Sequence, residues 1–180
     1  TTRMIVRRPA SAAKFNGTVI VEWLNVSASY DIEAHWATSH AHFLRSGYAW
    51  VGISCQRVGV HDAETGLKAW SPNRYGSLNI SSDNLSYDIF SQGAKAIKTP
   101  GSVNVMGGLP VKYVIAAGAS QSAIYLARYY NGIQAHSRGG VFNGFFILIS
   151  GGSLRTNLTV PVFNIYSETE VPTLTRQADS

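Results

Sequence analysis

The chain has 180 residues, of which 45% are hydrophobic and 14% charged, and this composition is typical of a globular domain rather than of a disordered chain. The net charge is +5, but the basic residues are scattered and only Arg7 and Arg8 are adjacent, so we expect no nucleic-acid partner. No apolar stretch is long enough to span a membrane, and no signal peptide is visible. Because the sequence contains neither H-E-x-x-H nor paired cysteines, we expect no metal and no cofactor.

The number of glycosylation sequons bears on localisation. Five sequons of the form N-x-[ST] occur, where about two would be expected by chance, and they begin at Asn16, Asn25, Asn79, Asn84 and Asn157. The excess favours passage through a eukaryotic secretory pathway and predicts a secreted or extracellular glycoprotein. The alternative is a protein rich in Ser and Thr whose sequons are not used.

The first half of the chain alternates between apolar runs with strand character and segments with helical spacing. Residues 18–24 are β-branched and apolar, which is typical of a buried strand, and residues 31–46 carry apolar side chains at helical spacing before Gly47. A second strand is expected over 48–54. Residues 56–84 are rich in Gly, Pro, Ser and Asn and indicate a long excursion, after which residues 85–97 read as a helix.

The second half continues the alternation and sets the fold class. A strand over 111–117, a helix over 121–130 and two further strands over 141–149 and 160–166 are expected. Strands without polar alternation are buried on both faces, so the pattern predicts an α/β fold with a mostly parallel sheet covered by helices on both faces. No domain boundary is visible, and we expect one domain over residues 1–180.

The junction between the third expected strand and the helix that follows it reads Gly118-Ala119-Ser120-Gln121-Ser122. It fits the small-x-Ser-x-small pattern of a nucleophile elbow, in which a serine sits on a sharp strand-to-helix turn. The residues two positions before and after the serine come close together, so they must be small. The pattern favours Ser120 as a nucleophile, and the alternative is an ordinary Gly-rich turn in which Ser120 caps the helix.

A nucleophilic serine needs an acid and a base, and in this type of site the chain order is serine, acid, histidine. The acid should follow the last expected strand, where Glu168 and Glu170 lie. We expect Glu170 to be the acid and keep Glu168 as the alternative. Both could also be solvated loop residues.

The base is not evident from the sequence, because no histidine follows Glu170. His35, His40 and His42 belong to the first expected helix and His61 to the excursion, where structural roles are expected. His136, after the helix that follows Ser120, is the one upstream candidate that we keep. We expect the catalytic histidine to lie on a C-terminal segment missing from these residues, and the chain to associate with that segment.

The oxyanion of the reaction would need two backbone donors. One is expected from the N–H of Gln121, at the start of the helix. The second should come from the loop after the first strand, as the N–H of Asn25 or Val26. If Asn25 lies there, it is expected to be buried and unglycosylated despite its sequon.

Several longer segments resemble a broad family of alpha/beta hydrolase domain proteins found in bacteria and fungi. The resemblance covers nearly the whole chain and rests on residues 7–9 (RRP), 16–26 (NGTVIVEWLNV), 47–60 (GYAWVGISCQRVGV), 67–78 (LKAWSPNRYGSL), 87–92 (YDIFSQ), 118–123 (GASQSA) and 167–171 (SETEV).

The resemblance implies an α/β-hydrolase fold and a Ser-acid-His triad in which Ser120 is the elbow serine. Family members usually extend at both ends, with the histidine beyond the acid, which agrees with the histidine expected outside residues 1–180. The position of Glu170 is more often Asp in the family, and this departure leaves the assignment of the acid open. The segments around Gln56 and over 70–75 resemble the family without an assignable role.

Together these features predict a serine hydrolase that cleaves a small carboxylic ester through an acyl-enzyme on Ser120. The same triad could instead open a lactone, transfer an acyl group or cleave a C–C bond. A non-catalytic binding protein of the same fold is the alternative from another class, and the absence of a histidine after Glu170 is its support.

Overall fold

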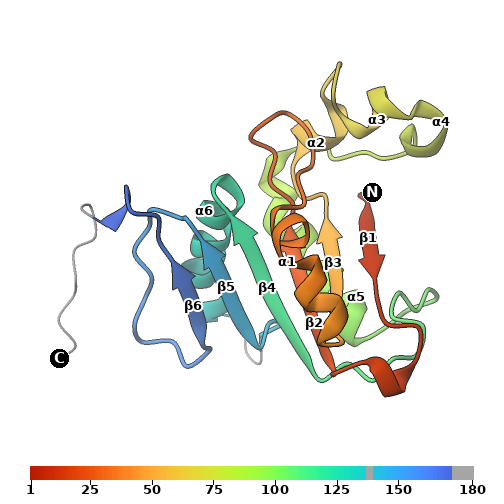
Figure 1. The fold of residues 1–180 in the computed structure, drawn as a ribbon. Helices are drawn as coiled ribbons and strands as arrows, with labels where there is room; N and C mark the ends of the chain where they lie inside the picture. Colours follow the sequence, from red (N-terminus) through yellow and green to blue (C-terminus); the bar gives the residue numbers. More distant parts are fainter. Residues whose placement is uncertain (137–139, 172–180) are drawn as a thin grey trace.

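A computed structural model describes residues 1–136 and 140–171 and contains a six-stranded sheet (Figure 1). The strand order is β1-β3-β2-β4-β5-β6, and all neighbouring pairs are parallel except β1 with β3. The strands are β1 (Met4–Arg7), β2 (Thr18–Trp23), β3 (Ala49–Ile53), β4 (Tyr113–Ala119), β5 (Gly144–Leu148) and β6 (Val162–Ile165). The mostly parallel sheet predicted from the sequence is therefore confirmed.

Three longer helices lie against the sheet, and the shorter ones lie in the connections. The longer helices are α1 (Ala34–Arg45), α5 (Ser86–Lys98) and α6 (Gln121–Arg128), each within a few residues of its expected range. The short elements are η1 (Ala12–Lys14), α2 (Arg57–His61), α3 (Leu67–Trp70), α4 (Pro72–Tyr75), η2 (Asp83–Leu85), η3 (Tyr129–Ile133) and η4 (Gln134–His136). Among the described residues, no helix is both long and apolar enough to cross a membrane.

Two parts of the structure differ from the sequence expectation. Strand β1 was not predicted, because it is only four residues long and pairs with the sheet on one side alone. The excursion over 56–84, for which the sequence predicted no particular helix or strand, contains α2, α3 and α4. Each of these helices has only four or five residues, too few for a periodic pattern to stand out.

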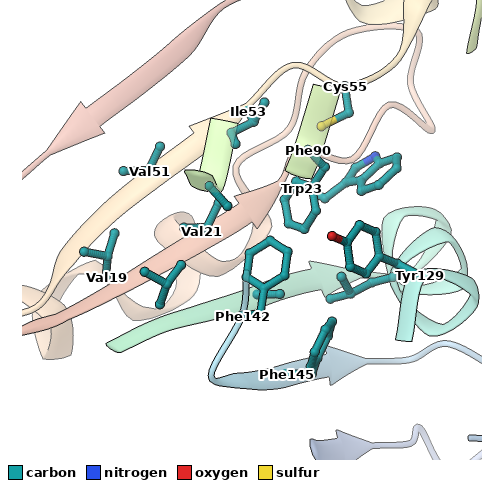
Figure 2. Close-up of a cluster of buried hydrophobic side chains, with 14 of the residues drawn as sticks. Val19, Val21, Trp23, Val51, Ile53, Cys55, Phe90, Tyr129, Phe142 and Phe145 are labelled. Carbon is teal, nitrogen blue, oxygen red and sulfur yellow. The ribbon is translucent and has the colours of Figure 1, made fainter. Parts of the chain in front are cut away.

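Side chains of β2 alternate between two separate cores, one on each face of the sheet. Val19, Val21 and Trp23 point into the larger core, which α5 and α6 cover (Figure 2). Ile20 and Leu24 point into the smaller core beneath α1. Helices therefore cover both faces, as the apolar strands predicted.

Aromatic side chains fill the larger core near the carboxyl end of β2. Phe90 of α5 is fully buried, and its ring centroid lies 5.1 Å from that of Trp23, 4.9 Å from Phe142 and 5.8 Å from Tyr129 (Figure 2). Burying such a side chain contributes about 1.5–3 kcal/mol by itself. These contacts bind α5 and the segment after α6 to the centre of the sheet.

A buried glutamate, Glu22, fixes the start of α1 on the sheet. Its carboxylate accepts hydrogen bonds from the backbone N–H groups of His35 at 2.8 Å and Trp36 at 3.2 Å, and from the indole of Trp50 at 2.8 Å. A negative group is favourable at a helix N-terminus, where backbone donors lack intrahelical partners. Because α1 begins directly after the loop over 24–33, Glu22 also fixes the C-terminal end of that loop, where it joins the helix.

The same face of the sheet is much less covered over β5 and β6. The register pairs Phe146 with Phe163 and Leu148 with Ile165, so these four side chains share the face that carries α1 further along the sheet. Phe163 is 65% exposed and Ile165 37% exposed. In Figure 1, α1 lies in front of β2 and β3, and β5 and β6 lie to its left, where α1 does not cover them.

Candidate active site

Ser120 lies on the sharp turn between β4 and α6 that the sequence predicted. Its backbone has φ 54° and ψ −120°, a region that non-glycine residues rarely occupy. The side chain is exposed, and none of the described residues forms a hydrogen bond with its hydroxyl. The turn thus presents an unengaged serine hydroxyl at the carboxyl edge of the sheet, where ligands of open α/β folds bind.

Close packing within the turn explains why the residues two positions before and after Ser120, Gly118 and Ser122, are small. A Cβ atom at Gly118 would lie 3.0 Å from the backbone oxygen of Ser122. Ser122 is fully buried, and its hydroxyl donates to the Ala119 carbonyl at 2.9 Å and accepts from the Ala119 N–H at 3.0 Å. The motif therefore contains one exposed serine and one serine that is used in packing the turn.

Hydrogen bonds to both neighbouring strands hold the turn in place. The N–H of Ser120 donates to the Leu148 carbonyl at the end of β5, at 2.8 Å. On the other side, the Asn25 side-chain amide donates to the Ala119 carbonyl, also at 2.8 Å. The strained conformation of Ser120 is thus stabilised by contacts with segments far away in the sequence.

The two loop residues expected as oxyanion donors, Asn25 and Val26, differ in the hydrogen bonds that their backbone N–H groups form. The N–H of Asn25 donates to the Ile32 carbonyl at 3.1 Å, in a bridge that closes the loop, so it is already used. The N–H of Val26 faces only the side-chain oxygen of Gln121, at 3.5 Å. Asn25 is 5% exposed, which agrees with the expectation that its sequon is buried.

Gln121 is the first residue of α6, so its N–H has no intrahelical acceptor and points out of the N-terminus of the helix. Together with the N–H of Val26 it provides two backbone donors beside Ser120. A developing negative charge would also be favoured by the α6 dipole. Of the two loop residues, Asn25 already donates its N–H to a backbone carbonyl, so Val26 is the better candidate for a second donor.

Of the two candidate acids, Glu170 is the one held in a defined position. Its carboxylate accepts hydrogen bonds from the N–H of Ser167 at 2.7 Å and from the Ser167 hydroxyl at 2.9 Å. A Cβ atom at Gly151 would lie 3.6 Å from the other oxygen of Glu170, so the carboxylate lies beside the turn after β5. Glu168 is exposed. Ser120 is hydrogen-bonded to the end of β5 and Glu170 lies beside the turn that follows β5, so both residues lie at the carboxyl edge of the sheet.

None of the five histidines contacts Ser120 in the part of the chain that the structure describes. Four have other partners: His35 is buried beside Glu22, His40 lies 3.1 Å from the Trp36 carbonyl, His61 accepts from the N–H of Ile80, and His136 lies 2.6 Å from the Gly132 carbonyl. The exposed ring of His42 lies against Tyr48.

The upstream candidate, His136, is poorly placed for the role of base. Strands β4 and β5 are parallel, so the connection that contains α6 must return the chain to the opposite edge of the sheet. His136 comes near the end of that connection, shortly before β5 begins at Gly144. The structure therefore does not bring His136 to Ser120.

A cavity of about 270 Å³ lies beside the loop over 24–33. Its lining includes Arg3, Asp31, Gly59 and Trp70 but not Ser120. Asp31, to which the sequence assigned no role, accepts hydrogen bonds from Arg3 at 2.8 Å and from the Ser54 hydroxyl. Burial raises the pKa of Asp31, and the hydrogen bond from Ser54 and the charge of Arg3 oppose that shift. Within the described residues, no group of three His, Cys, Asp or Glu side chains is arranged to hold a metal ion.

The comparison with family sequences decides the classification. The alpha/beta hydrolase domain family matches residues 1–180, which is the whole chain. The chain belongs to this family. No curated protein sequence matches it. The resemblance noted from the sequence segments, and the α/β-hydrolase fold that it implied, are therefore confirmed.

The fold is also similar to those of solved hydrolases at low sequence identity. Esterase 2 of Thermogutta terrifontis, phosphorylated by paraoxon, is 12% identical with a TM-score of 0.45, over 82% of this chain and 52% of that chain. A candidate carboxylesterase from Lactobacillus plantarum is 11% identical with a TM-score of 0.47, over 82% and 59%. A prolyl endopeptidase is 13% identical with a TM-score of 0.48, over 81% and 19%. The chain thus spans a little over half the length of the two esterases.

Proposed function

We propose that the protein is a serine hydrolase that cleaves a carboxylic ester through an acyl-enzyme on Ser120. The observation that carries the proposal is the conformation of Ser120, with φ 54° and an exposed hydroxyl at the N-terminus of α6. Such strain persists only where the surrounding structure enforces it, and it clusters at functional sites. A serine that merely capped α6 would accept a hydrogen bond from the first turn of the helix, and its side chain makes no such bond.

In the proposed mechanism, the Ser120 hydroxyl attacks the ester carbonyl and passes its proton to a histidine base. The N–H groups of Gln121 and Val26 donate hydrogen bonds to the tetrahedral oxyanion, and loss of one such donor typically costs about 3 kcal/mol of barrier. The protonated base then gives its proton to the leaving alcohol. Water, activated by the same base, attacks the acyl group, which releases the carboxylic acid and restores the Ser120 hydroxyl.

The proposed triad takes its acid from the described chain and its base from outside it. Glu170 would orient the histidine and stabilise its protonated form. We propose that this histidine lies outside residues 1–180, on a C-terminal segment that associates with the chain, since no described histidine contacts Ser120. The substrate would be a small ester, bound at the exposed edge of the sheet above Ser120.

Reaction with a fluorophosphonate tests the proposal directly, because such probes form a covalent bond only with an activated serine. The natural protein, with any associated segment, should gain the mass of one probe, and the modified peptide should contain Ser120. Ser120→Ala should abolish labelling. Ser91→Ala is the matched control, because it removes a serine hydroxyl that is bonded to Tyr129 and is not part of the turn, and it should leave labelling in place.

Labelling at Ser120 would justify assays with a panel of esters. If esters were not turned over, lactone opening, acyl transfer or C–C cleavage by the same triad would be tested next. A folded, unlabelled wild-type protein would contradict the proposal and favour a non-catalytic binding protein. That alternative is supported by the lack of a histidine partner for Ser120 within residues 1–136 and 140–171.

We also propose that the protein is secreted and glycosylated. Asn79, Asn84 and Asn157 are exposed, which supports their use as acceptors, whereas Asn25 is buried against the elbow. The intact mass of the natural protein before and after enzymatic removal of N-linked glycans tests this proposal. An unchanged mass would contradict glycosylation.

A further inference from the structure

A buried glutamine, Gln56, connects the two segments that carry the proposed oxyanion donors. Gln56 follows β3 and is 3% exposed. Its side-chain oxygen accepts one hydrogen bond from the indole N–H of Trp23, at 3.2 Å, and one from the side-chain amide of Gln121, at 2.9 Å. A single amide oxygen therefore contacts both the end of β2 and the first residue of α6.

The chemistry of Trp23 determines the direction of every hydrogen bond in this chain of contacts. An indole N–H can only donate, so Gln56 must present its oxygen to it. The second partner of that oxygen must also be a donor, which requires Gln121 to present its NH₂ group. The oxygen of Gln121 then points away from Gln56, toward the N–H of Val26 at 3.5 Å.

Local structure does not account for the position of the Gln56 side chain. Gln56 is the N-cap residue of α2, yet its side chain forms no capping hydrogen bond with that helix. It instead reaches Gln121, which is 65 residues away in the sequence. The amide is thus oriented toward the elbow and away from its own helix.

We propose that Gln56 is a positioning residue for the reaction of Ser120, an inference that rests on the proposed function. Gln56 holds the side chain of Gln121, and that side chain holds the N–H of Val26 in the direction of the oxyanion. The hydrogen bond from the Val26 N–H to the Gln121 oxygen is long, at 3.5 Å, and therefore weak. The N–H can exchange this acceptor for the developing oxyanion at little cost in free energy. The donors are therefore oriented before the substrate binds.

The first test replaces the amide of Gln56 and keeps the length of the side chain. Gln56→Met should lower kcat on p-nitrophenyl acetate by about tenfold, because it displaces an oxyanion donor without removing it. KM should stay within about twofold, because the donors act mainly on the transition state. Ser91→Ala is the matched control: it removes a hydrogen bond to Tyr129, at 2.7 Å, in the core away from Ser120, and it should leave kcat unchanged.

A double-mutant cycle separates positioning from a general effect on packing. If Gln56 acts through Gln121, the double variant Gln56→Met, Gln121→Met should be no slower than Gln121→Met alone. If the two losses of kcat simply multiply, Gln56 does not act through Gln121 and the inference is overturned. An unchanged kcat in Gln56→Met overturns it as well.

Amide hydrogen exchange of the peptide that contains Val26 tests the link without any reaction. Exchange at this N–H should be about tenfold faster in Gln56→Met than in the wild-type protein, because the loop loses its anchor. Equal exchange would overturn the inference. If the wild-type protein fails to react with the fluorophosphonate while Gln56→Met still shows faster exchange, the proposed function fails and the positioning link stands.

Discussion

The two halves of the sheet differ in how firmly they hold the parts of the proposed site. Over β1 to β4, helices cover both faces, and the elbow, the loop over 24–33 and Gln56 are joined by buried hydrogen bonds. Over β5 and β6, one face is open and carries the exposed Phe163 and Ile165. The proposed nucleophile and oxyanion donors belong to the first half, and the proposed acid, Glu170, belongs to the second.

This difference indicates which part of the chemistry the described chain provides. Oxyanion stabilisation and the strained serine depend on backbone geometry, and the covered half fixes that geometry through contacts distant in the sequence. Proton transfer would depend on the proposed acid and base, and of these only the proposed acid, Glu170, lies among the described residues of the open half. The comparison can be tested by variants matched between the two halves.

The largest expected effect is the loss of kcat when Glu170, the proposed acid in the open half, is replaced. Glu170→Ala should lower kcat on p-nitrophenyl acetate by about 10³- to 10⁴-fold, because removal of a triad acid leaves the histidine without orientation or charge stabilisation. Glu168→Ala is the matched control and should stay within about twofold. The reverse ranking would show that Glu168 is the acid.

A pair of phenylalanines compares the stability of the two halves. Phe90→Ala should lower the free energy of unfolding by about 3–5 kcal/mol, because Phe90 is fully buried in the larger core. Phe163→Ala should cost less than about 1 kcal/mol, because its ring is largely exposed on β6. Urea unfolding curves of the natural protein measure both values. Equal losses would show that the face of β6 is covered in the intact protein and would remove the difference between the halves.

The smallest effect concerns the excursion over 56–84, within which His61 joins the end of α2 to the segment that contains Ile80. Its ring accepts a hydrogen bond from the N–H of Ile80 at 3.0 Å, and this bond requires the neutral form. Burial lowers the pKa of His61 from its usual 6.5, and the charges of Lys68 and Arg57 lower it further.

Because the pKa is lower in the folded state, the stabilisation is present above pH 6.5 and is lost as the pH falls through the folded-state value. Between pH 7.5 and pH 5, the Tm of the wild type should fall by about 2 °C more than that of His61→Gln, a small shift because the ring is only partly buried. His40→Gln is the control for an exposed histidine. Parallel pH profiles of the wild type and His61→Gln would contradict the prediction.

The features that could be predicted from the sequence are those that depend on neighbouring residues. The apolar strands, the three longer helices and the small residues around Ser120 produce local patterns, and the structure contains each of them. The missed features depend on contacts between distant segments. The choice of Val26 over Asn25 follows from the bridge to Ile32, and the role proposed for Gln56 follows from its contact with Gln121. No pattern within one segment could have shown either.

The backbone at Ser120 limits which amino acids could serve as the nucleophile. A positive φ is uncommon for any residue other than glycine and is least favourable for one branched at Cβ, although Ile149 adopts φ 60° directly after β5. Threonine has the same hydroxyl chemistry as serine, but its branched Cβ makes this backbone conformation less favourable. Cysteine, which is unbranched at Cβ, could keep the turn. The backbone geometry at this one residue therefore favours an attacking group whose side chain is unbranched at Cβ.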